Sequence, residues 1–373
     1  MNKKEILEIR KQFSPQNCAI TRICGCYVDG DKEKKLEFKE AFLSLPEEEE
    51  FKYFDIFKKT LSGTVGKNLL NMGFPLDQEF KGGTQDFLLQ LKNSKLTDDI
   101  LLSEFYDKVV ESYDFGEHYL ILLIHAAYDV PGRASDGMEM FDASDTVYDF
   151  ILCSICPVSL SKAGLCYNAE KNAIEDRIRD WIVGEPATGF LFPAFNDRSS
   201  DLHNLLYYSK KPEELQDYFV EQVLGCNEVM SAGTQKDSFH TILSDTLGES
   251  CNYEIVKSIH ENLNEMIEEN KESLDSFALD KKDMRRLLSV SGVAEENLES
   301  FDKDYDEAVG EKSTLLVSNI ASTRKFNIKT PEIVINVNPE RADLVEIREI
   351  DGRKCLVIPV DSEVEVNGIN VKS

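Results

Sequence analysis

The chain has 373 residues, of which 42% are hydrophobic, so it is long enough to bury a sizeable core in two or three domains. Its 69 acidic and 42 basic side chains give a formal charge of −27, which disfavours binding to nucleic acid or to an anionic membrane. The longest apolar run, 119–128, is shorter than the roughly 20 residues of a membrane-spanning helix, and the N-terminus lacks the apolar stretch of a signal peptide. We expect a cytoplasmic protein.

The first region, 1–115, is predicted to contain an N-terminal hairpin followed by helices. Asp29-Gly30 is a turn signal between two strand-like runs. Ser44 and Glu47 have the spacing of a capping box, which favours a helix that starts there. The expected elements are a helix over 3–13, strands over 19–28 and 36–42, and helices over 44–63, 65–72, 84–91 and 97–113.

The central region, 116–210, has the most strand-like sequence of the chain. Strands are predicted over 119–128, 147–156, 188–195 and 202–208, separated by loops rich in Gly, Pro, Asp and Ser. Residues 173–183 fit either a strand or a short helix. This region also contains most of the side chains that could carry chemistry.

Two further regions complete the predicted organisation. Region 211–311 is helical and acidic, and its residues 245–311 have 19 Asp and Glu against 7 Lys and Arg. Region 312–373 is predicted to form a small antiparallel sheet, with hairpin turns at Asp351-Gly352 and Asn367-Gly368. The fold class is therefore α+β, with a central strand-rich region flanked by helical segments.

Cysteines provide the first candidate site. Cys153 and Cys156 form a CxxC pair, and a zinc site would require two more ligands, such as Cys24 and Cys26. Residues at positions i and i+3 of a strand point to opposite faces, which argues against a shared metal. Redox chemistry and buried structural thiols are the alternatives, and we favour buried thiols.

The acidic stretch 129–149 provides a second candidate site. Asp129, Asp145 and Asp149 could supply oxygen ligands to a divalent metal such as Mg²⁺ or Mn²⁺. The alternative, which we favour, is that Asp142 caps a short helix and that Asp145 interacts with the helix dipole.

A third candidate site follows the strand at 188–195. Arg198 could bind a phosphate or carboxylate, with Asp201 or His203 as acid or base. A surface connection between strands has the same composition. His125, within an apolar strand, is either a catalytic base or, as we favour, a hydrogen-bonded core histidine.

With these residues in view, the chain resembles a family of uncharacterised proteins from anaerobic Gram-positive bacteria, classed as a domain of unknown function. The matching phrases are CAITRICGCYVDG (18–30), LSGTVGKNLLNM (61–72), YDVPGR (128–133), CPVSLSKAGL (156–165), GFLFPAFNDRS (189–199), NPERADLVE (338–346) and IDGRKCLVIPV (350–360). The resemblance implies a bacterial cytosolic protein, but no catalytic residue, substrate or cofactor.

Three functional hypotheses follow from the sequence. The first is a non-catalytic binding or regulatory protein whose acidic surface binds a protein partner with a basic or polar surface. The second is a metal-dependent hydrolase or phosphotransferase that uses the acidic loop 129–149 and Arg198. The third is a zinc or thiol site at Cys153 and Cys156. Whether the chain is an enzyme stays open, as does its oligomeric state.

Overall fold

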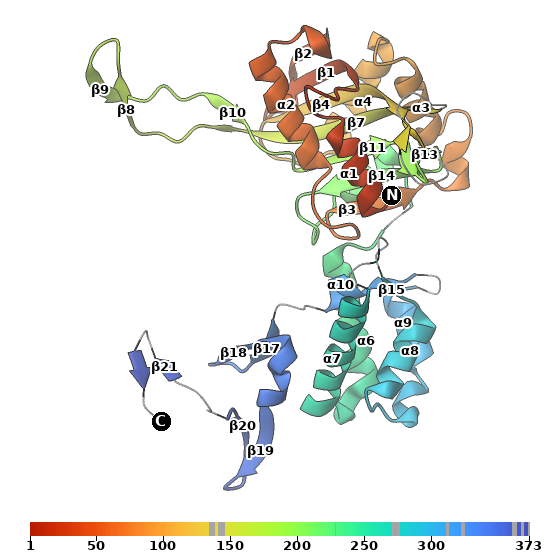
Figure 1. Ribbon diagram of the computed structural model, residues 1–373, viewed down its shortest axis with the longest axis vertical. Coiled ribbons are helices and arrows are strands. Elements are labelled where there is room, and N and C mark those ends of the chain that lie inside the picture. Colours follow the sequence, from red (N-terminus) through yellow and green to blue (C-terminus); the bar gives the residue numbers. More distant parts are fainter. Residues whose placement is uncertain are drawn as a thin grey trace. The chain divides into compact units, whose positions relative to one another are not determined.

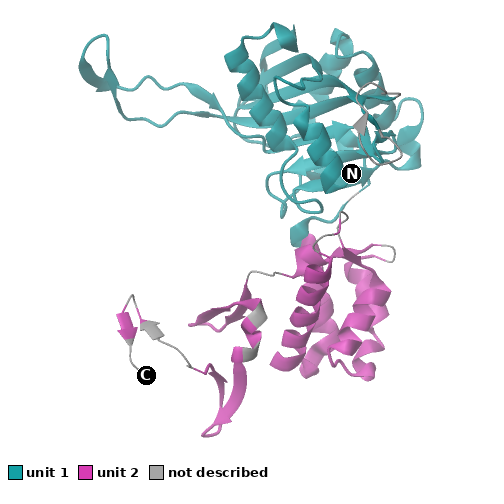
Figure 2. Ribbon diagram, viewed as in Figure 1, with its two compact units in different colours: residues 1–233 teal, residues 234–373 magenta. Residues whose placement is uncertain are grey.

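We analysed a computed structural model of the chain. It describes residues 1–133, 139–140, 146–227, 229–270, 273, 277–310, 313–321, 325–359, 364–366 and 369–371. The chain divides into two compact units, 1–233 and 234–373, shown in different colours in Figure 2. The fold is α+β, as predicted.

An antiparallel sheet forms the centre of the first unit. Its strands are β1 (Ile20–Val28), β2 (Lys34–Ala41), β3 (Leu69–Gly73), β4 (Tyr119–Val130), β7 (Thr146–Leu160), β10 (Trp181–Val183), β11 (Thr188–Phe192) and β14 (Asn204–Ser209). The strand order is β2-β1-β4-β7-β11-β14-β3, and β10 pairs with β7. Both the N-terminal and the central regions therefore contribute strands to one sheet.

Helices cover both faces of this sheet (Figure 1). They are α1 (Lys3–Lys11), α2 (Glu47–Thr60), α3 (Thr84–Asn93), α4 (Asp99–Ser112), and α5 (Asp217–Phe219), which continues into a π-helical turn over Val220–Leu224. Helices α1 and α2 pack on one face, whereas α3, α4 and the turn after α5 pack on the other. Buried apolar residues on both faces explain why the central strands read as continuous apolar runs.

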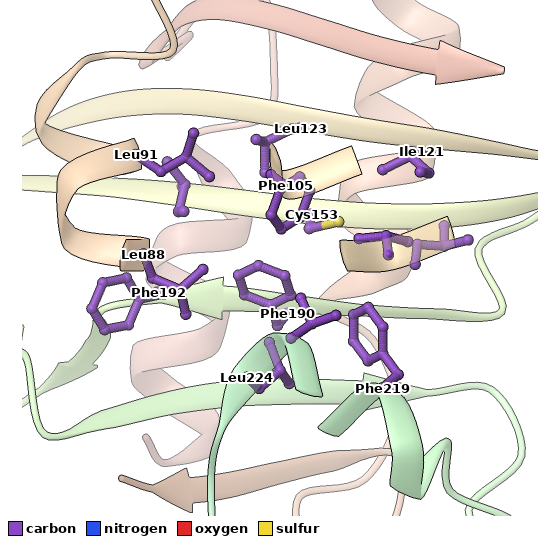
Figure 3. Close-up of a cluster of buried hydrophobic side chains, with 14 of the residues drawn as sticks. Leu88, Leu91, Phe105, Ile121, Leu123, Cys153, Phe190, Phe192, Phe219 and Leu224 are labelled. Atoms are coloured by element: carbon purple, nitrogen blue, oxygen red, sulfur yellow. The ribbon is translucent and has the colours of Figure 1, made fainter. Parts of the chain in front are cut away.

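Phe190 lies near the middle of the core between the sheet and helices α3 and α4. Figure 3 shows its ring among side chains from several elements, including Leu88, Phe105 and Cys153. Along β4, Ile121 and Leu123 point into this core. The alternate residues Leu122 and Ile124 point into a second core, between the sheet and helices α1 and α2.

Local capping signals explain where two of the helices begin. Asn2 and Glu5 form a capping box at the start of α1. Asp98 accepts hydrogen bonds from two backbone amides at the start of α4. Helix α2 begins at Glu47 after Pro46, and four of its five acidic residues lie in the first turn, where the helix dipole favours them.

The predicted helix over 65–72 is wrong, because this segment contains the edge strand β3, which pairs with β14. Gly63 and Gly66 adopt positive φ angles that interrupt a helix. As part of a strand in the sheet, Leu69, Leu70 and Met72 are all buried. The segment 173–183, which fitted either state, contains strands β9 (Ala173–Asp176) and β10.

Three small hairpins accompany the main sheet. Strand β12 (Ala194–Asn196) pairs with β13 (Ser199–Asp201), and β5 (Gly132–Arg133) pairs with β6 (Glu139–Met140). The third hairpin, β8 (Leu165–Asn168) with β9, lies at the end of a long extension between β7 and β10 that projects from the sheet in Figure 1. We call residues 161–180 the arm.

The second unit contains helices and short hairpins. Its helices are α6 (Ala232–Leu247, which starts at the unit boundary), α7 (Tyr253–Glu269), α8 (Lys281–Val290), α9 (Phe301–Ala308) and α10 (Val317–Ile320). The strand pairs are β15 (Ala278–Leu279) with β16 (Leu315–Leu316), β17 (Phe326–Lys329) with β18 (Val334–Val337), β19 (Glu346–Ile350) with β20 (Arg353–Val357), and β21 (Val364–Val366) with β22 (Ile369–Val371).

The C-terminal region forms antiparallel strands, as predicted, and they are arranged as separate hairpins. Asp351 and Gly352 both have positive φ angles, as the turn between β19 and β20 requires. The second predicted turn, Asn367-Gly368, lies outside the described residues. The start of region 312–373 departs from the predicted sheet, because strand β16 is followed directly by the short helix α10. Among the described residues, no helix is long and apolar enough to cross a membrane.

Candidate functional site

Four polar side chains meet in the sheet and form what we call the His125 cluster. His125 is fully buried in β4. Its Nδ1 lies 2.6 Å from Oγ1 of Thr21 in β1, and its Nε2 lies 2.9 Å from Oδ1 of Asp149 in β7. Nζ of Lys92 in α3 lies 3.8 Å from the other carboxylate oxygen of Asp149. The cluster thus connects three strands and one helix.

Strand register explains this arrangement. In the β4–β7 ladder, His125 lies opposite Ile151 and Asp149 lies opposite Ala127, so the two polar side chains are diagonal neighbours on one face. An irregularity in the β1–β4 ladder between Ile20 and Arg22 falls at Thr21, whose hydroxyl then reaches His125.

Burial decides the charge of His125. It lowers the pKa of the imidazole, and the nearby Asp149 carboxylate, which raises the pKa, does not fully compensate; Lys95 and Lys92 lower it further. The imidazole is therefore neutral at pH 7. Its Nε2 is not aligned for a hydrogen bond to any described residue, although it lies 2.9 Å from Oδ1 of Asp149.

A neutral imidazole between a hydroxyl and a carboxylate is an arrangement that general bases use. Here, however, the Thr21 hydroxyl also donates to the His125 backbone carbonyl at 3.2 Å. The imidazole itself is fully buried. These features fit the favoured sequence interpretation, a hydrogen-bonded core histidine, and we assign the cluster a structural role.

This cluster predicts a pH dependence of stability. Because the folded-state pKa of His125 lies below its unfolded value of about 6.5, its contribution is complete above that pH and is lost as the pH falls. Urea unfolding of the first unit, followed by fluorescence of the single tryptophan, Trp181, should show a free energy of unfolding that decreases from pH 7 to pH 5. The variant His125→Gln should show a shallower decrease.

His203 offers a control of opposite sign. Glu79, 2.8 Å away, raises the pKa of His203, so this pair stabilises the fold at low pH and loses its effect as the pH rises through the folded pKa. The variant His203→Gln should therefore steepen the decrease toward low pH. Equal pH slopes in His125→Gln and the parent protein would contradict the burial argument.

Arg198 lies on the other face of the sheet and binds α1. Its Nη2 and Nε lie 2.9 Å and 3.1 Å from Oε1 of Glu8, and the Tyr128 hydroxyl donates to the same oxygen at 3.0 Å. Next to it, the backbone amide of Asp197 donates to Glu5 at 2.7 Å. Arg198 therefore fixes α1 to the β12–β13 turn, and its guanidinium is engaged by a carboxylate of the chain itself.

Asp201 and His203 lie near Arg198 in sequence but have local partners. Burial raises the pKa of Asp201, but hydrogen bonds from Asn196, Asn204 and the His203 amide together lower it below its usual value. His203 is exposed and interacts with Glu79. The two side chains thus stabilise the β13–β14 connection, and the structure does not bring them to the His125 cluster.

The acidic-loop candidates are only partly described. Asp149 belongs to the His125 cluster and Asp129 is exposed near the end of β4, whereas Asp142 and Asp145 lie outside the described residues. Among the residues that the structure describes, no three His, Cys, Asp or Glu side chains are grouped to hold a metal ion. Arg198, the proposed anion ligand, faces α1 rather than Asp149.

The cysteine candidates do not converge either. Cys24, Cys26 and Cys153 are buried in the core beneath α3 and α4. Cys156 lies opposite Leu120, which packs in the core on the other face of the sheet, so Cys156 points to that face, as strand alternation predicts. Burial raises the pKa of Cys24, Cys26 and Cys156 to about 12, so their thiols are protonated at neutral pH.

A groove at the base of the arm was not predicted from the sequence. It has a volume of about 770 Å³. Its lining comes from α2, from Leu120 of β4, and from β10 with the turn that follows it, and comprises Glu49, Lys52, Tyr53, Asp55, Ile56, Lys59, Leu120 and residues 181–186. We call it the β10 groove. Trp181, half exposed, contributes to its wall and packs against His118, with 4.1 Å between the ring centroids and 40° between the ring planes.

The arm itself is one-sided. Cross-strand pairing places Tyr167 opposite Ile174 and Leu165 opposite Asp176, so three large apolar side chains and one carboxylate share this face. These three side chains are 61%, 64% and 77% exposed, and Ile178, just beyond β9, is 83% exposed. The opposite face is polar: Asn168 donates to Glu175 at 2.6 Å, and Lys171 pairs with Glu175 at 3.0 Å.

Comparison with known proteins identifies a family but no characterised relative. No curated protein and no solved structure matches the chain. A family model described as a domain of unknown function, DUF4317, matches residues 1–369, nearly the whole sequence and both units. The chain therefore belongs to the DUF4317 family.

Proposed function

We propose that this chain is a non-catalytic binding protein whose docking element is the arm. The observation that carries the proposal is the apolar face formed by Leu165, Tyr167 and Ile174, which no part of the first unit covers among the described residues. A hairpin with one apolar and one polar face is the pattern of a sheet that is half buried. The arm has the polar side solvated and the apolar side open.

Energetics support a partner for this face. Burying a Leu, Ile or Phe side chain contributes about 1.5–3 kcal/mol relative to leaving it exposed. An isolated two-stranded hairpin is at best marginally stable in water. Strands β8 and β9 contact each other and extend well beyond the main sheet, so burial against a protein partner would stabilise them.

The proposal agrees with the first of the three hypotheses from the sequence and ranks the other two lower. The acidic helices of the second unit offer a surface for a partner with a basic or polar face, and the cytoplasm remains the proposed location. The metal-dependent hydrolase is a weaker alternative, because Asp149 contacts His125 and Lys92 while Arg198 is held by Glu8. The zinc alternative is weaker too, because Cys156 and Cys153 occupy opposite faces.

Site-specific photo-crosslinking in cells tests the proposal without knowledge of the partner. A photoreactive amino acid at position 174 lies on the apolar face, and the same group at the exposed neighbouring position 173 lies on the polar face and serves as the matched control. We expect protein adducts from position 174 in large excess over position 173. Equal yields from the two positions, or adducts from neither, would show that the apolar face does not dock on protein.

A further inference from the structure

We propose that the partner of the arm is a second copy of this chain, whose β10 groove receives the apolar face of the arm. This inference rests on the proposed function and names the partner. The arm supplies Tyr167, Ile174 and Ile178, and the groove supplies Tyr53, Ile56 and Trp181. One chain thus carries both an unburied apolar face and an open site lined with apolar side chains.

Charge supports self-association through this segment in particular. Two copies of a chain with a formal charge of −27 repel each other. The arm, 161–180, has four Lys and Arg (162, 171, 177 and 179) and four Asp and Glu (170, 175, 176 and 180), so it is neutral. It can approach another copy without adding to the repulsion.

The groove carries charges of both signs at its rim. Glu49, Lys52 and Asp55 of α2 line it without an ion pair to any described residue, so two of these three unpaired groups are acidic. Arg177 of the arm is exposed and likewise makes no ion pair within the described residues. A docked arm would bring this cation, at the edge of the apolar face, within reach of Glu49 and Asp55 of the other copy.

Geometry permits a closed pair. Ten residues of extended chain reach on the order of 30 Å, so an arm can span from its own sheet to a neighbouring copy. Because arm and groove are adjacent on one chain, a two-fold axis would place each arm in the other groove, and the two contacts would double the buried area. Such an arrangement closes on itself and gives a dimer.

Matched variants of the full chain test this arrangement by analytical ultracentrifugation. Ile174→Asp disables the arm, and Ala173→Asp places the same charge on its polar face as a control. Ile182→Asp disables the groove, and Ile100→Asp, at an exposed isoleucine of α4 on the other side of the sheet, is its control. Circular dichroism shows whether each variant retains its secondary structure.

We expect the parent chain and both controls to be dimers, and the dissociation constant to rise at least about tenfold in Ile174→Asp and in Ile182→Asp. Mixing these two variants provides the decisive result. The intact arm of one can enter the intact groove of the other, so the mixture should dimerise more tightly than either variant alone.

Other outcomes overturn the inference. A monomeric parent chain, or a dimer insensitive to both variants, would exclude self-docking. Sensitivity to Ile174→Asp without sensitivity to Ile182→Asp, and without rescue on mixing, would mean that two arms pair with each other instead. Adducts from position 174 that contain a different protein would refute the second copy as partner and leave the proposed function standing.

Discussion

Replacing Phe190 by alanine is expected to lower the free energy of unfolding of the first unit by about 3–5 kcal/mol. Phe190 is fully buried in β11, where it lies opposite Cys153 on one side and Tyr207 on the other. Its ring centroid is 6.2 Å from that of Phe105 in α4. The substitution removes a large apolar group from the contact between sheet and helix and leaves a cavity.

Urea unfolding monitored by Trp181 fluorescence measures this loss. Phe80→Ala is the matched control, because the same side chain is removed at a position that is 70% exposed, and it should change the free energy by less than about 0.5 kcal/mol. A decrease below about 1 kcal/mol for Phe190→Ala would contradict the packing around β11.

The adjacent substitution, Gly189→Ala, is expected to cost about 3 kcal/mol or more, at the upper end for an overpacked core. A Cβ atom at position 189 would lie 2.3 Å from the carbonyl oxygen of Cys153 and 2.7 Å from Cγ2 of Thr60. The nearer atom belongs to the backbone of β7, which is held in the sheet and cannot easily move. The cost is therefore steric.

Two further variants separate the contributions. Gly164→Ala adds the same methyl group where no atom lies within 4 Å, so it should be nearly neutral in the same urea experiment. Thr60→Ser in the Gly189→Ala background removes the Cγ2 contact and retains the hydroxyl that lies 2.6 Å from Ser154. It should recover only a small part of the stability, because the contact with Cys153 remains. Full recovery would contradict this account.

The main features of the fold could be predicted because they depend on local patterns. Continuous apolar runs predicted β4, β7, β11 and β14, and an Asp-Gly pair predicted the turn between β19 and β20. The segment 65–72 differs from its prediction because its apolar residues fit a helix equally well. Only the long-range pairing of β3 with β14 decides for a strand, and a single sequence does not reveal that pairing.

The candidate sites show the same division between local and long-range information. Strand alternation was sufficient to predict that Cys153 and Cys156 face opposite sides. It could not predict that His125 meets Asp149, since that depends on register across two strands, or that Glu8, 190 residues from Arg198, binds its guanidinium. The alternation of large apolar and smaller or polar residues at 165–168 is a sign of a one-sided hairpin. That the apolar side chains of the arm are exposed is known only from the structure.

Trp181 gives the most direct test of the central claim, the inference that the arm docks in the β10 groove of a second copy of the chain. Its indole is half exposed at this groove, and it is the only tryptophan of the chain. At constant pH, raising the protein concentration from nanomolar to micromolar should shift its emission to shorter wavelength and reduce quenching by acrylamide. The variant Ile174→Asp should retain the emission of the exposed state throughout. An identical spectrum and identical quenching at all concentrations in the parent chain would contradict this account.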